Sequence, residues 1–188
     1  MVTSVGVLAL QGDVREHLSI LDSLGVQSFP TKKPEQLAEL DALVIPGGES
    51  TTIGKMAVRF GLLEPLRNAI QEGKPVYGTC AGMIFLASAI TDGDQPLIGS
   101  LDVVVKRNAF GRQNESFESE LDIDGLSDPF HAVFIRAPWI EKVGSEVAVL
   151  ASIRDHPVMV RQDTILATSF HPELTGDGRI HRMLLDMI

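Results

Sequence analysis

The strongest chemical signal in the sequence is its single cysteine, which lies in the pentapeptide Gly78-Thr79-Cys80-Ala81-Gly82. The apolar run before it is typical of a buried strand, and the run after it is typical of a helix. A nucleophile on such a sharp turn needs small neighbours, because side chains there would clash. The start of a helix beside the sulfur also favours the thiolate. A lone cysteine is usually inert core filler, but two glycines flanking a strand–helix junction favour a nucleophile.

A cysteine nucleophile needs a base, and His171 is the best candidate because it opens the tripeptide His171-Pro172-Glu173 after a predicted strand. A residue before proline favours extended geometry, in which residues two apart point the same way. Glu173 is therefore expected beside the imidazole, completing a Cys80–His171–Glu173 triad. The alternative is that Glu173 only caps the next turn. Of the remaining histidines, His131 is expected to be structural, at the start of a strand. Three others are expected at solvated helix or loop positions: His17, His156 and His181.

A second glycine-rich segment, Pro46-Gly47-Gly48-Glu49-Ser50, follows another predicted strand. Adjacent glycines expose backbone N–H groups and tolerate unusual dihedral angles, as an oxyanion hole requires. A phosphate-binding loop is the competing interpretation. It fails because five residues, not four, separate Gly48 from Gly54, and Met56 follows Lys55 where serine or threonine is needed.

The elements that must position these residues alternate between strand and helix in the first half of the chain. This alternation predicts an α/β fold with an open, mostly parallel, three-layer sheet and helices on both faces. The second half predicts closely spaced strands, added antiparallel to that sheet or as a small sheet beside it. The predicted strands are residues 4–10, 26–29, 41–46, 75–79, 101–107, 116–123, 131–135, 146–153, 157–162 and 165–170. The predicted helices are a segment capped by Asp13 and ended by Gly25, then 34–40, 51–72 with a break near Gly61, 81–90 and 179–188.

Length and composition limit the class of protein. The 188 residues predict one domain over the whole chain, and 44% hydrophobic with 22% charged residues is ordinary for a globular protein. The net charge of −9 argues against binding to nucleic acid or anionic lipid. One cysteine excludes an internal disulfide and a cysteine-rich zinc site. No apolar run reaches the ~20 residues of a membrane span, and no basic region precedes Arg15, so we expect a cytoplasmic protein.

Several of these motifs together resemble the triad class of glutamine amidotransferases. Further segments look like the glutaminase subunits of pyridoxal phosphate synthase, and the resemblance extends from Leu8 to Leu174. The superfamily motifs are Gly-Thr-Cys-Ala-Gly at 78–82, Pro-Gly-Gly-Glu-Ser at 46–50 and Ser-Phe-His-Pro-Glu at 169–173. The more specific segments are Leu-Ala-Leu-Gln-Gly at 8–12, Val-Arg-Glu-His at 14–17, Arg-Asn-Ala-Phe-Gly-Arg-Gln at 107–113 and Phe-Ile-Arg-Ala-Pro at 134–138.

The resemblance implies a role for each matching residue. Cys80 is the implied nucleophile, with His171 and Glu173 as its relay. The implied oxyanion hole uses the N–H of Ala81 and one N–H of Gly47 or Gly48. The implied glutamine pocket comprises Gly48, Glu49, Ser50, Arg107, Ile135 and Arg136. The resemblance also implies that ammonia passes to a separate (β/α)-barrel synthase subunit, and that no metal or organic cofactor takes part.

Two other interpretations remain open at this point. The same elbow serves other hydrolases, such as a γ-glutamyl hydrolase or a cysteine peptidase, which assays on glutamine and on γ-glutamyl peptides would separate. A non-enzymatic member of the fold would keep Cys80 only as a relic. In that case a glutamine-analogue chloroketone or diazoketone would fail to label Cys80.

Overall fold

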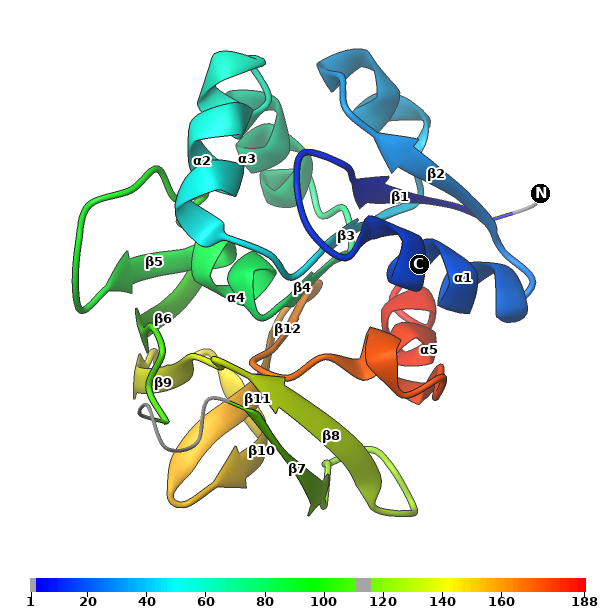
Figure 1. The fold of residues 1–188 in the computed structure, drawn as a ribbon. Coiled ribbons are helices and arrows are strands. Elements are labelled where there is room, and N and C mark those ends of the chain that lie inside the picture. Colours follow the sequence, from blue (N-terminus) through cyan, green and yellow to red (C-terminus); the bar gives the residue numbers. More distant parts are fainter. Residues whose placement is uncertain (1–2, 111–115) are drawn as a thin grey trace.

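A computed structural model describes residues 3–110 and 116–188 of the chain (Figure 1). Its centre is a seven-stranded sheet in the order β10-β11-β12-β4-β3-β1-β2. The five strands from β12 to β2 pair in parallel, and β11 and β10 add antiparallel at one edge. These strands are β1 Ser4–Leu8, β2 Gln27–Thr31, β3 Ala42–Ile45, β4 Val76–Thr79, β10 Ala148–Ile153, β11 His156–Gln162 and β12 Ile165–Thr168.

Two smaller sheets flank the central one. β5 (Ala87–Ile90), β6 (Leu101–Lys106) and β9 (Trp139–Val143) form the first, and β7 (Ser116–Leu121) with β8 (Phe130–Ile135) forms the second. Both arrangements expected for the second half therefore occur together. The strand β9 is an element that the sequence pattern did not reveal.

Helices cover both faces of the central sheet, as Figure 1 shows. On one face lie η1 (Pro34–Glu39), α2 (Ser50–Arg59), α3 (Leu63–Gln71) and α4 (Ala81–Leu86). On the other lie α1 (Val14–Ser23) and α5 (Arg179–Leu185). Alternate residues of β3 enter different cores: Leu43 and Ile45 pack with the first set, Ala42 and Val44 with the second. The predicted three-layer α/β fold is confirmed.

The helix predicted over residues 81–90 is wrong in its second half. The helix α4 ends at Leu86, and the next four residues form β5, which pairs in parallel with β6. An apolar run does not distinguish a buried helix from a buried strand, so tertiary pairing decides. The predicted break of the long helical segment is confirmed, because Gly61 separates α2 from α3 with a φ of +66°.

Candidate active site

Cys80 occupies the sharp turn between β4 and α4 that its flanking glycines predicted. Its backbone adopts φ 48° and ψ −101°, a conformation that L residues rarely hold, and its N–H donates to the carbonyl of Thr168 over 2.7 Å. A Cβ on Gly82 would lie 2.1 Å from the carbonyl oxygen of Ile45, and one on Gly78 would lie 2.8 Å from backbone atoms of Gly82. Both glycines are therefore required for the turn to form.

His171 lies at the same edge of the sheet, three residues after the end of β12. Its Nδ1 lies 2.7 Å from Oε1 of Glu173, so the predicted contact is present. The predicted geometry is wrong, however, because Pro172–Leu174 forms a turn of 3-10 helix (η3) with His171 as its N-cap residue. The two side chains meet across the start of this turn rather than along an extended segment.

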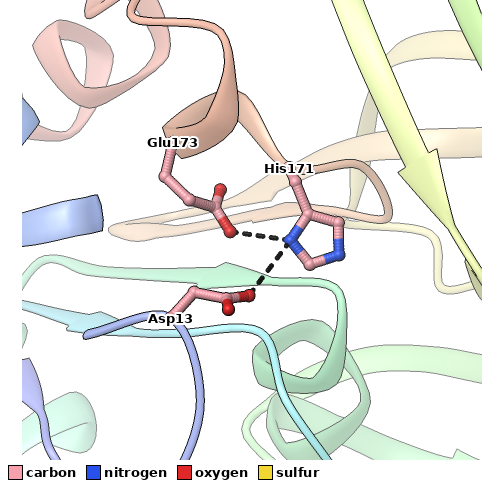
Figure 2. Close-up of side chains that lie close together, drawn as sticks. All are labelled: Asp13, His171 and Glu173. Carbon is pink, nitrogen blue, oxygen red and sulfur yellow. Dashed lines mark hydrogen bonds and ion pairs between the residues drawn. The ribbon is translucent and has the colours of Figure 1, made fainter. Parts of the chain in front are cut away.

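A second carboxylate reaches the same imidazole nitrogen. Asp13 Oδ2 lies 3.5 Å from His171 Nδ1, and Figure 2 shows the ring nitrogen facing both Asp13 and Glu173 while the other nitrogen points away. The sequence predicted Asp13 as a cap of α1. Asp13 does occupy the N-cap position, but its side chain makes no capping hydrogen bond. Its carboxylate has turned toward His171 instead.

These neighbours determine the charge of His171. Burial alone would lower the pKa of the imidazole, but hydrogen bonds with Asp13, Cys80 and Glu173 outweigh burial and raise the pKa to about 12. His171 therefore carries a proton at neutral pH. The ligand atoms of Asp13, His171 and Glu173 lie within 4.8 Å of one another, close enough for a cation, but the Nδ1 proton of His171 already occupies the space between the carboxylates.

A cleft of about 440 Å³ opens above Cys80 and His171. Ala81 lines this cleft, and so does every residue that the family resemblance implied for the glutamine pocket: Gly48, Glu49, Ser50, Arg107, Ile135 and Arg136. Gly47 lies beside the cleft, where a Cβ would come within 2.5 Å of Cε1 of His171. Residues 111–113 of the predicted Arg107–Gln113 segment lie outside the described residues.

The glycine pair is fixed to the segment before α1. The carbonyl of Gly47 accepts the N–H of Asp13 over 3.1 Å, and the N–H of Glu49 donates to Oε1 of Gln11 over 2.7 Å. The Glu49 carboxylate caps α2 by accepting the N–H groups of Thr51 and Thr52. Burial raises the pKa of Glu49, but these hydrogen bonds and those of the threonine hydroxyls outweigh it, so the pKa is lowered overall.

The guanidinium of Arg107 is held by Gln95, a loop residue to which the sequence analysis assigned no role. Oε1 of the buried Gln95 accepts from the hydroxyl of Ser50 at 3.1 Å, from that of Thr51 at 3.1 Å and from Nη1 of Arg107 at 3.2 Å. Arg107 also pairs with Asp92 at 3.2 Å. One buried amide oxygen thus fixes two of the pocket residues relative to each other.

The predictions for the other histidines are partly wrong. His17 and His181 were expected at solvated positions, yet both are completely buried. His156 is half-buried and stacks on Trp139, with ring centroids 3.6 Å apart. His131 lies on the exposed face of β8, between the carboxylates of Glu118 and Glu120.

Four residues around the site were missed by interpreting motifs one at a time: Gln11, Asp13, His17 and Gln95. A signal for His17 was present, because the spacing of Val14, His17, Leu18 and Leu21 places this histidine on the apolar face of its helix. No comparable signal marks Gln95, which belongs to a loop and is defined only by its contacts.

The fold and the cleft define a class of protein. A solved structure described as a glutamine amidotransferase superimposes with a TM-score of 0.94 at 52% identity, covering 97% of each chain. The sequence pattern of the SNO glutamine amidotransferase family matches residues 7–188, and the chain belongs to this family. It is 60% identical over 98% of its length to the pyridoxal 5'-phosphate synthase subunit PdxT of Frankia alni, of which it covers 94%. It is 58% identical, again over 98% of its length, to the PdxT of Streptomyces coelicolor, of which it covers 93%.

Proposed function

We propose that this chain, acting as one domain over residues 1–188, is the glutaminase subunit of a pyridoxal 5'-phosphate synthase. It hydrolyses L-glutamine to L-glutamate and ammonia. The observation that carries the proposal is the strained Cys80 in a cleft beside His171, whose imidazole is paired with Glu173. The names of the relatives, each described as a pyridoxal 5'-phosphate synthase subunit, support the choice of pathway.

In the proposed reaction the sulfur of Cys80 attacks the amide carbon of the glutamine side chain. Nδ1 of His171 is engaged by carboxylates, so Nε2 is the nitrogen that serves the sulfur and the substrate. The protonated imidazole gives its proton to the leaving nitrogen, because an amide nitrogen leaves poorly unless it is protonated. Water then cleaves the thioester, with the imidazole as base, and releases glutamate.

The proposed oxyanion hole consists of the N–H of Ala81 and one N–H of the Gly47–Gly48 pair. The first N–H groups of a helix have no partner within it, so that of Ala81 at the start of α4 is available. The Gly47 carbonyl accepts the N–H of Asp13, and because the 47–48 peptide is trans, the N–H of Gly48 points away from Asp13; a flip of this peptide would exchange the two directions. Losing one such donor typically costs about 3–4 kcal/mol of barrier.

The remaining lining residues form the proposed glutamine pocket. Ser50 and Arg107 present polar groups held by Gln95, while Gly48 and Glu49 contribute backbone. Ile135 and Arg136 close the opposite wall from the end of β8. The lining contains the acidic Glu49 and the basic Arg107 and Arg136, and this mixture of charges suits a zwitterionic amino acid.

The proposed partner is a separate (β/α)-barrel synthase subunit, which receives the ammonia in a hetero-oligomer in the cytoplasm. No metal, organic cofactor, nucleic acid or membrane takes part in the proposed reaction. No helix in the described ranges is both long and apolar enough to span a membrane. The net charge of −9 supports a partner other than nucleic acid.

The test is release of ammonia and glutamate from L-glutamine by the purified chain, with and without the synthase subunit. We expect turnover in the mixture, and covalent labelling of Cys80 by a glutamine-analogue chloroketone. Cleavage of γ-glutamyl peptides but not of glutamine would instead support a γ-glutamyl hydrolase. Absence of both turnover and labelling in the complex would reject the proposal.

The same assay tests a proposed regulatory step. A flip of the Gly47–Gly48 peptide on synthase binding would break the bond between the Gly47 carbonyl and Asp13, and would couple the oxyanion hole to the presence of the ammonia acceptor. Equal glutamine turnover with and without the synthase subunit would reject this switch.

A further inference from the structure

Two buried histidines form a contact series that begins at the Glu173 carboxylate. His17 comes from α1 and His181 from α5, the two helices that cover the same face of the sheet (Figure 1). Nδ1 of His17 lies 2.8 Å from Nε2 of His181. Nε2 of His17 lies 3.1 Å from the hydroxyl of Thr79 and 3.6 Å from Oε1 of Glu173. The same carboxylate oxygen accepts Nδ1–H of His171.

The charge of Glu173 favours one assignment of the protons on the two rings. A lone pair on His17 Nε2 would face the Glu173 carboxylate and be repelled, so this nitrogen carries the hydrogen. His17 Nδ1 is then an acceptor, and His181 donates to it from Nε2. The remaining nitrogen of His181, Nδ1, has no partner in the described part of the chain. This arrangement leaves a lone pair rather than an N–H unpaired, and buried unpaired N–H groups are the rarer case.

Both rings are neutral donors rather than cations. Burial lowers the pKa of His17 well below its usual value, and the charges of His181 and His171 lower it further. Burial also lowers the pKa of His181, to about 4. The chain therefore places a directed series of N–H groups, from His181 through His17, toward Glu173 without adding a net charge.

Glu173 depends on such donors because it is buried. Burial raises the pKa of its carboxyl, and hydrogen bonding to His171 opposes that rise. Its other oxygen, Oε2, has no hydrogen-bond partner among the described residues. The remaining ionisable neighbours do not help: Asp13 raises the pKa of Glu173, and the buried Tyr77 directs its hydroxyl to Thr168 over 2.9 Å. Oε1 is thus the oxygen through which the ionised form is stabilised.

We propose that His17 is a positioning residue for the triad, holding Glu173 ionised and oriented through its Nε2–H while His181 fixes its tautomer. The proposal rests on the proposed glutaminase function, and it extends the relay from three residues to five. Thr79, the residue before Cys80, accepts the hydrogen bond of this N–H at 3.1 Å, and the Glu173 carboxylate lies 3.6 Å from the same nitrogen, where the N–H acts on it electrostatically.

The kinetic test compares three variants in the complex with the synthase subunit. His17→Leu removes the donor. His17→Gln keeps an amide N–H near the position of Nε2. His131→Gln removes a histidine from an exposed position on β8 and serves as the control. The readout is the pH profile of kcat for glutamine hydrolysis between pH 5 and 9, with KM measured at each pH.

We expect His17→Leu to lower kcat by about tenfold with KM unchanged, and to move the acid limb upward by about one pH unit, because Glu173 protonates more readily. His17→Gln should restore most of kcat and return the limb toward its original position, and His131→Gln should change neither. Equal losses in both His17 variants with an unmoved acid limb would show that His17 only fills space, and would overturn the proposal.

Imidazole ¹⁵N NMR of the wild-type chain gives a second test that needs no variant to fold. We expect His17 to be neutral and in the Nε2–H form from pH 5.5 to 8. An Nδ1–H form, or a protonated ring, would overturn the proposal even if the kinetics agreed. Wild-type complex that releases no ammonia would instead reject the proposed glutaminase function, and the NMR result would still decide the tautomer of His17.

Discussion

Three of the five histidines are buried in one continuous set of contacts, yet their environments act in opposite directions. His171 faces two carboxylates and Cys80, and its pKa is raised to about 12. His181 contacts the imidazole of His17 and the ring of Tyr77, and burial lowers its pKa to about 4. Both are almost fully inaccessible to solvent. The difference shows that burial does not fix the charge of a histidine, because the groups it faces decide whether burial is outweighed.

The largest expected effect comes from removing the sulfur of Cys80, which is one of the groups beside His171. Cys80→Ala should lower glutamine hydrolysis by more than about 10⁴-fold, as loss of a nucleophile typically does. It should also lower the pKa of His171, because one of the three groups that raise it is gone. Ammonia release by the complex and ¹⁵N titration of His171 measure the two effects. Wild-type turnover in this variant would refute the assignment of Cys80.

The next effect separates the proposed base, His171, from the carboxylate proposed to orient it, Glu173. His171→Ala should cost more activity than Glu173→Ala, by roughly 10²-fold, because in the proposed mechanism Glu173 acts only through the imidazole. Glu173→Gln is the matched control, since it keeps the shape of the side chain and removes its charge. Rates of the three variants, measured at saturating glutamine in the complex, decide the order. Equal losses would mean that Glu173 contacts the reacting atoms itself.

A stability measurement probes the buried pair. The pKa of His181 is lower in the folded chain than in the unfolded chain, so the unfolded state binds more protons between pH 6.5 and 4. Stability should therefore be complete above pH 6.5 and fall as the pH decreases, by about 2 kcal/mol from pH 7 to 5 on account of this residue. Urea unfolding at both pH values should show a smaller fall in His181→Leu. An identical fall in both proteins would contradict the prediction.

The smallest effect concerns the second carboxylate on His171. Asp13→Asn keeps the size of the side chain and removes a charge 3.5 Å from Nδ1. Because Asp13 is partly exposed and Glu173 remains, the loss in kcat should be about threefold, with a lower pKa for His171. The pH profile and ¹⁵N titration measure these changes. A loss as large as that of Glu173→Gln would give Asp13 an equal part in the relay.

Local sequence patterns predicted the parts of the site that depend on backbone geometry. The glycines around Cys80 and the pair Gly47–Gly48 are required by contacts within about 3 Å, which only a residue without a side chain tolerates. The alternation of strands and helices predicted that these turns meet at one edge of a parallel sheet. Family resemblance added the pocket residues, all of which line the cleft.

The wrong predictions concern polar residues whose local sequence fits both a solvated position and a buried contact. Asp13 is an ordinary cap residue at an ordinary cap position, and nothing local reveals that its carboxylate faces His171. Polar side chains on short helices are usually solvated, so His17 and His181 were expected in water. Each is buried because a second helix lies beside it and supplies a hydrogen-bond partner.

The sequence by itself determined which chemical groups are present and how the chain turns around them, because glycine spacing and apolar periodicity act over a few residues. Only the tertiary structure decided which groups face each imidazole. Those contacts join residues as far apart as His17 and His181, and charge in a buried site depends on the partners that the fold brings within a few ångströms.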